Sequence, residues 1–260
     1  AVGRQGVVIA AFAQALDQSL EQLWQPRFRL IRTEPNAERS PVTRPIVFYL
    51  DRGTPEPVRS ALLEGANWWS AAFDQAGFVD AFRAELQPAN VDLMDLQVNA
   101  ITWTHRATRG WSYGGGIIDP RSGEIIKGFV NLGSQRVRQD LLIAETLLAP
   151  FAADADPALA AQAQAMALAR LRQLAAHEVG HALGLAHNFA ASAHGNGSVM
   201  DYPHPLIQLR EDRIDLSTPY GVGVGPWDYF AIKHAYQIFP AASEAAELQA
   251  LRTHIRALGF

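Results

Sequence analysis

Residues 177–187 constrain this chain more than any other segment, and they read His-Glu-Val-Gly-His-Ala-Leu-Gly-Leu-Ala-His. His177 and His181 are four residues apart, so on a helix their side chains lie on one face, one turn apart. His187 follows six residues later and cannot reach the same point if the helix simply continues. Gly184 resolves this, because glycine readily adopts the left-handed conformation that ends a helix and reverses the chain. The fold must therefore place a helix, a sharp turn and a returning segment around one point.

Three neutral imidazoles around one point form a metal site with room for a further ligand. Zinc accepts histidine nitrogens, and a catalytic zinc site has three protein ligands and leaves its fourth position to water. The chain has no cysteine, which excludes thiolate ligands and disulfides. The sequence thus predicts one catalytic Zn²⁺ held by His177, His181 and His187. The alternative is an amphipathic helix that buries two hydrogen-bonded histidines.

The eleven residues, followed by Ser198-Val199-Met200-Asp201-Tyr202, resemble the metzincin clan of zinc peptidases. The motif of that clan is H-E-x-x-H-x-x-G-x-x-H with a methionine turn after it. The wider sequence is similar to one bacterial branch, the "zinc-dependent metalloprotease" family, over about residues 27–240. Four segments carry this likeness: Pro45–Asp51, Trp69–Phe78, Ile118–Ile125 and Met200–Pro205. Members of this family are exported, so the resemblance implies a periplasmic or secreted protein.

The expected fold is α+β, of the metzincin type. The resemblance implies a twisted, mainly mixed sheet of about five strands, packed on an active-site helix and a second long helix. A smaller, irregular and helical C-terminal subdomain completes it. We expect one catalytic domain over residues 1–260. It would consist of a helical N-terminal extension (1–26), an upper subdomain (about 27–187) and a lower subdomain with the methionine turn (about 188–260).

Hydrophobic periodicity and turn residues predict the elements along the chain. Helices are expected over Gly6–Leu23, Thr54–Gly77, Asp156 to about Gly184, Pro226–Phe239 and Glu244–Leu258. Strands are expected at Ile46–Leu50, Phe82–Leu86, Val98–Thr104, Trp111–Ile118 and Glu124–Leu132. A strand, a helix, further strands and then helices is itself an α+β order.

Three residues around the histidines have expected roles. Glu178 would act as general base, taking a proton from a metal-bound water and passing it to the leaving amine; otherwise it is an ordinary exposed helix residue. By resemblance, Met200 packs beneath the histidines as a soft hydrophobic base. Tyr202 matches the tyrosine of astacin-like and serralysin-like members, whose phenol hydrogen-bonds the developing oxyanion. Its alternative role is a buried core tyrosine with its hydroxyl on a backbone group.

The run Gly114, Gly115 and Gly116 is unusual inside a predicted strand, because glycine weakens a strand and buries no side chain. One interpretation is close approach by a bound peptide, which makes these glycines substrate-binding residues. The other is a bulge or a flexible loop.

Composition excludes several classes of function. A chain of 260 residues with 48% hydrophobic residues and charges of both signs can bury a substantial core. A net charge of −4 gives no electrostatic reason to expect nucleic acid or an anionic membrane as partner. The chain has no apolar run of about 18 residues, so no transmembrane helix is expected. Asp17 and Glu21 argue against a signal peptide around Val7–Ala15.

The expected function is that of a zinc-dependent endopeptidase that hydrolyses peptide or protein substrates. Two alternatives remain open. One is hydrolysis of another amide, such as a peptidoglycan crosslink or a modified side chain. The other is a peptide-binding module without turnover, against which the intact Glu178 and all three histidines argue.

Overall fold

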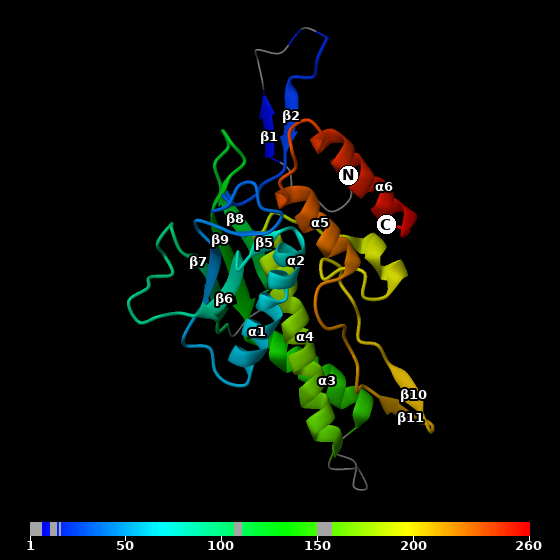
Figure 1. Cartoon of the computed structure of the whole chain (residues 1–260). Coiled ribbons are helices and arrows are strands. Elements are labelled where there is room, and N and C mark those ends of the chain that lie inside the picture. The colour runs from blue at the N-terminus through cyan, green and yellow to red at the C-terminus, as the bar shows by residue number, and fades with distance from the viewer. Residues whose placement is uncertain (1–6, 11–14, 16, 107–110, 150–157) are drawn as a thin grey trace.

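A five-stranded mixed sheet forms the centre of the computed structural model, which describes residues 7–10, 15, 17–106, 111–149 and 158–260 (Figure 1). The strand order is β6-β4-β7-β9-β8. These strands are β4 (Ile46–Leu50), β6 (Phe82–Leu86), β7 (Asn99–Thr104), β8 (Tyr113–Ile118) and β9 (Ile125–Gly133). Neighbouring strands are parallel except for β8, which runs antiparallel to β9 at one edge. The five predicted strands are confirmed, with small shifts at their ends.

Three helices lie together on one side of this sheet: α1 (Val58–Asn67), α2 (Trp69–Gln75) and α4 (Ala158–Ala182) (Figure 1). The single helix expected over Thr54–Gly77 is divided in two at Trp68. The indole N–H of Trp69 donates to the carbonyl of Ala176 at 2.8 Å, which fixes α2 against α4. The core between helices and sheet is apolar; its largest fully buried side chains include Phe48, Leu50, Leu62, Trp69, Phe73, Ile101, Leu132 and Leu171.

Helix α4 contains 25 residues and carries the first two histidines near its C-terminal end. Its end at Ala182 lies close to the expected one, whereas the expected start at Asp156 lies outside the described residues. α3 (Gln135–Leu148) packs along α4 and was not expected. Ser134 at its start is a residue type favoured there, although its side chain makes no capping bond. The α+β class, with its mixed sheet and long helix, is confirmed.

The helix expected over Gly6–Leu23 is wrong for the described residues. β1 (Val7–Ala10) and β2 (Glu21–Trp24) pair antiparallel, with Val8 opposite Leu23. Consecutive β-branched residues at the start of this segment favour extended backbone over helix. Val8 and Leu23 are both exposed, and Figure 1 shows the two strands standing away from the central sheet. The helical N-terminal extension is thus corrected to a pair of strands.

The C-terminal part combines short elements with two helices. Its elements are the 3₁₀ helix η1 (Phe189–His194), β10 (Gln208–Arg210), β11 (Arg213–Asp215), α5 (Pro226–Tyr236) and α6 (Glu244–Ala257). The two predicted helices are confirmed as α5 and α6. Tyr236 joins α5 to the upper core, because its ring packs edge-on to Phe73 at 5.0 Å and its hydroxyl donates to the carbonyl of Leu183 at 3.3 Å. β3 (Ser40–Pro41) and β5 (Phe78–Val79) form a small parallel pair. Among the described helices, none is both long and apolar enough to span a bilayer.

Candidate metal centre

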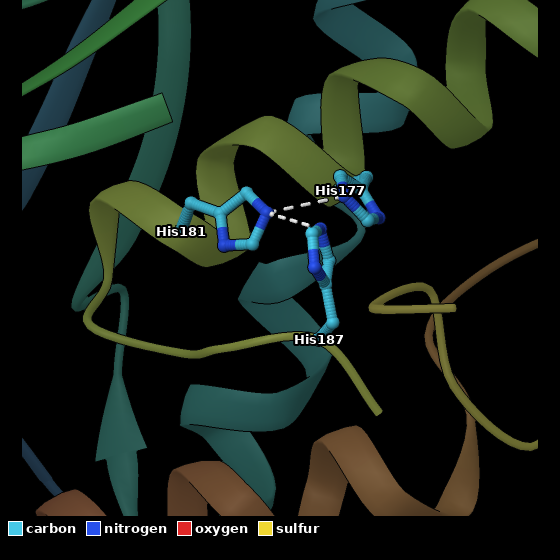
Figure 2. A group of neighbouring side chains, drawn as sticks. All are labelled: His177, His181 and His187. Atoms are coloured by element: carbon cyan, nitrogen blue, oxygen red, sulfur yellow. Dashed lines mark hydrogen bonds between the residues drawn. The ribbon is translucent and has the colours of Figure 1, made fainter. Parts of the chain in front are cut away.

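The three predicted histidines meet at the C-terminal end of α4 (Figure 2). His177 and His181 extend from successive turns of the helix, and their Nε2 atoms are 3.2 Å apart. The Nε2 atom of His187 lies 3.1 Å from that of His181. The structure therefore brings together residues that are ten positions apart along the chain.

Gly184 makes this convergence feasible, as expected. Its φ is +93°, a left-handed conformation that a residue with a Cβ atom adopts only with strain. The N–H of Gly184 donates to the carbonyl of His181 at 3.0 Å, and the N–H of Leu185 donates to that of Gly180 at 3.0 Å. These bonds end α4 and reverse the chain. His187 is thereby carried back towards the helix.

Two of the imidazoles are oriented by backbone carbonyls. Nδ1 of His177 donates to the carbonyl of Val199, and Nδ1 of His181 donates to that of Leu185, both at 2.7 Å. With its proton on Nδ1, each neutral ring presents a bare Nε2 lone pair to the centre of the group. Burial, with a contribution from neighbouring His181, lowers the pKa of His177 to about 3. Burial also lowers the pKa of His181 and His187, so all three rings are neutral near pH 7.

This donor set fits zinc. Ligand nitrogens at 2.0–2.1 Å around a tetrahedral zinc lie about 3.3–3.4 Å from each other. The observed Nε2 separations of 3.2 and 3.1 Å are close to that value. Lone pairs that converge without a proton between them repel, unless a cation lies among them. Three neutral imidazoles also leave one tetrahedral position for water or substrate, as in a catalytic site.

Glu178 lies beside the group and is not part of it. Its side chain is buried, so it is not the exposed helix residue of the alternative interpretation. Burial raises the pKa of Glu178 to about 7, while the positive charge of Arg170 and the backbone N–H of Gly114 act in the opposite direction. A carboxyl whose pKa is close to neutral pH can both accept and return a proton there.

Met200 lies in the turn predicted beneath the histidines and is fully buried. Its carbonyl accepts from the N–H of Asn188 at 3.0 Å, which ties the turn to the residue after the third histidine. Its own N–H donates to the hydroxyl of Ser198 at 2.9 Å.

Asp228, at the start of α5, holds this turn and was missed in the sequence. Its carboxylate accepts from the hydroxyl of Ser198 at 2.6 Å, from the N–H of Val199 at 2.8 Å and from the N–H of Gly225 at 2.7 Å. Because the carbonyl of Val199 orients His177, Asp228 supports the first histidine through the turn. The only signal available was an acidic residue in the first turn of a helix that begins with proline.

Tyr202 lies over the histidines rather than in the core. Its ring centroid is 4.5 Å from that of His187 and 5.1 Å from that of His177. Its side chain is 58% exposed, which rules out a buried core tyrosine. Burial and the charge of Glu178 raise the pKa of the phenol, so it stays protonated near pH 7. The position suits the expected role, which remains a prediction.

The glycine run lies on β8, the exposed edge strand of the sheet. A Cβ atom at Gly114 would lie 1.9 Å from the carbonyl oxygen of Glu178, so β8 touches the backbone of α4. At Gly115 a Cβ atom would lie 3.2 Å from the ring of Phe129, and at Gly116 3.0 Å from a methyl group of Ile125. Close approach does explain the glycines, but the neighbour is the protein itself. Substrate binding along this edge remains a prediction.

A cavity of about 690 Å³ opens beside Glu178 and Tyr202. It runs along α4 past Leu174 to Arg170, and α3 forms part of its wall. Its remaining lining residues are Trp111, Ser112, Arg136, Gln139, Ile143, Pro203, His204, Pro205 and Tyr220. Sequence patterns did not indicate Arg136 or Arg170, because neither belongs to a local motif.

Residues 160–258 match the model of a protein family described as Met-zincin. This span holds all three histidines, Glu178, Met200 and Tyr202. The site is therefore similar to that of the Met-zincin family. Among solved structures, that of myroilysin is similar to this chain at 14% identity and a TM-score of 0.35, covering 79% of this chain and 98% of that one. None of the curated proteins matches. The Met-zincin family implies zinc, and His177, His181 and His187 form a group that can hold such an ion.

Proposed function

We propose that this protein is a zinc-dependent endopeptidase. The observation that carries the proposal is the convergence of three histidine Nε2 atoms, two of them on rings whose Nδ1 donates to a carbonyl, beside a buried carboxyl whose pKa is about 7. The match of residues 160–258 to the Met-zincin family supports it. His177, His181 and His187 would hold a zinc ion, which would supply a Lewis acid to polarise a carbonyl and lower the pKa of water.

Glu178 provides proton transfer at this site. Its carboxylate accepts a proton from the attacking water and returns it to the nitrogen of the leaving amine. Burial supports this role, because a pKa near 7 makes both transfers nearly balanced in free energy. The neighbouring N–H of Gly114 favours the ionised form and so keeps the carboxyl available as a base.

Tyr202 stabilises the oxyanion of the tetrahedral intermediate in this proposal. Its protonated phenol is a hydrogen-bond donor on the open side of the histidines. A donor aimed at a developing oxyanion contributes ~3 kcal/mol to the transition state.

The substrate lies along β8 as an added strand. Edge strands offer unpaired N–H and C=O groups, to which an extended peptide binds through its main chain. Because Gly114 touches the backbone of Glu178, a peptide on this edge passes close to the general base. Main-chain recognition favours peptides over other amides.

Incubation of zinc-loaded protein with a diverse peptide library, read by mass spectrometry, tests the proposal. We expect internal cleavage of peptides, which chelation abolishes. The matched control is Glu178→Gln, which should retain zinc and lose turnover by at least ~10²-fold. Cleavage restricted to peptidoglycan crosslinks or modified side chains would favour the hydrolysis of another amide. Peptide binding without cleavage would identify a binding module. Either result would overturn the proposal.

A further inference from the structure

Two arginines, Arg136 and Arg170, line the cavity beside Glu178, and one buried carboxylate outside its lining, that of Asp140, pairs with the first of them. Arg136 of α3 forms an ion pair with Asp140, with Nε–Oδ2 and Nη2–Oδ1 distances of 3.0 and 2.9 Å. Arg170 of α4 lines the same cavity and makes no ion pair with any described residue. Arg136, Arg170 and Asp140 together carry one positive charge in excess, and Glu178, two helical turns away along α4, attracts Arg170 less than Asp140 does.

Arg170 is held in place by neutral groups. Nη1 donates to the side-chain oxygen of Gln173, and the guanidinium carbon lies 5.8 Å from the ring centroid of Tyr220. The side chain is only 7% exposed, so little water compensates its charge. A guanidinium in such surroundings binds a carboxylate more strongly than one at the surface, because the local dielectric constant is low.

The position of this charge relates it to the reacting bond. Arg170, Leu174 and Glu178 follow each other at intervals of four residues along one face of α4, and all three line the cavity. Eight residues of helix span about 12 Å. Tyr202 also lines the cavity, and its ring packs against His177 and His187. A substrate held near Glu178 can therefore extend one side chain along the helix towards the arginines, past Leu174.

We propose that this cavity is a specificity pocket for a substrate side chain that carries a carboxylate, glutamate or aspartate, next to the scissile bond. This inference rests on the proposed endopeptidase function. The apolar wall from Leu174 and Ile143 contacts the methylene groups of that side chain, and Arg136 and Arg170 bind its carboxylate. One incoming carboxylate then gives each arginine one partner.

Cleavage sites from a peptide library provide the first test. We expect glutamate or aspartate to be enriched at one position directly flanking the cleaved bond. Changing that residue to the isosteric glutamine or asparagine should lower kcat/KM on the order of tenfold, the effect of one charge-assisted hydrogen bond. Cleavage without acidic enrichment would overturn the inference and leave the endopeptidase proposal intact.

Arginine variants provide the second test. In Arg136→Gln, Arg170 becomes the partner of Asp140 and the excess charge is lost, so the preference for glutamate over glutamine should fall to about one. Arg170→Gln should also lower the preference for glutamate over glutamine to about one, because it removes the buried positive charge itself. The matched control is Arg138→Gln, an exposed arginine two residues along α3, which should retain the preference. An unchanged glutamate-to-glutamine ratio in folded Arg136→Gln would refute the role of the arginines.

Binding decides the inference independently of turnover. Zinc-loaded Glu178→Gln protein is titrated, by calorimetry, with two hexapeptide pools that differ only in holding glutamate or glutamine at the fourth position. The glutamate pool should bind on the order of tenfold more tightly, and high salt should reduce the difference. Equal affinity for the two pools would overturn the inference even if no peptide were cleaved.

Discussion

Asp228→Ala tests whether the hydrogen bonds from Asp228 to the methionine turn stabilise the metal centre. The substitution removes the acceptor of three donors at once, namely the hydroxyl of Ser198 and the N–H groups of Val199 and Gly225. Asp228 is fully buried, so water does not replace it without opening the structure. Each buried donor left without an acceptor costs ~1–3 kcal/mol. We expect the free energy of unfolding to fall by ~3–5 kcal/mol.

The same change should weaken zinc binding, because Val199 orients His177. Loss of an outer partner of a metal-binding histidine typically lowers metal affinity by ~10–100-fold. Urea unfolding and competition with a chromophoric chelator measure the two effects. Asp228→Asn keeps an acceptor for both N–H groups and should be milder, and Glu247→Ala, an exposed carboxylate on α6, should stay within ~0.5 kcal/mol of the unmodified protein. Unchanged stability and zinc affinity in Asp228→Ala would refute the reasoning.

Asp228 should also give the stability a pH dependence. Burial raises its pKa from 3.8 to about 6, so the folded protein binds this proton more tightly than the unfolded chain does. The stabilisation is then fully present below about pH 4 and is lost as the pH rises through 6. Two pKa units correspond to ~3 kcal/mol. In zinc-free protein, the fall in unfolding free energy between pH 4 and 7 should be smaller in Asp228→Asn by about that amount. Equal falls in both proteins would contradict this assignment.

Three further changes test other parts of the site. Tyr202→Phe should lower kcat and kcat/KM together by ~10–10²-fold with KM and zinc content little changed; a lower unfolding temperature with unchanged kinetics would instead make the hydroxyl structural. Gly114→Ala places a Cβ atom 1.9 Å from the carbonyl oxygen of Glu178, so β8 must move away from α4. Turnover should then fall more than ~10-fold while zinc stays bound. Normal turnover would show that the spacing of β8 and α4 is unimportant. Chelation should abolish activity and leave circular dichroism largely unchanged, because the core does not depend on the metal; unfolding on chelation would show that it does.

The histidine cluster could be predicted because its determinants are local. His177, His181 and His187 meet because of three local features: a four-residue spacing on a helix, one left-handed glycine and a short segment that reverses direction after it. None of these features depends on the rest of the chain. The five strands were predictable for the same reason, since each is a short apolar run between turn residues.

Features that depend on long-range packing were missed. Arg136 and Arg170 line one cavity only because α3 packs along α4, and α3 itself was not predicted. Asp228 reaches the methionine turn from 28 residues further along the chain, a distance that no local pattern covers. The helix predicted at the N-terminus was wrong because the segment has a helical hydrophobic period, whereas its neighbouring β-branched residues favour a strand.

The backbone contact between Gly114 and Glu178 bears on two properties that can change independently, the rate of hydrolysis and the preference for a substrate side chain. A peptide on β8 would be positioned by main-chain atoms, and its distance from the proton acceptor would be fixed where strand and helix touch. Rate then depends on a spacing that side-chain substitutions elsewhere leave alone. Side-chain preference would depend on the cavity walls supplied by α3 and by the segment after the methionine turn. Descendants of this chain, or libraries built on it, can therefore diversify those walls and acquire new substrates without rebuilding the chemistry.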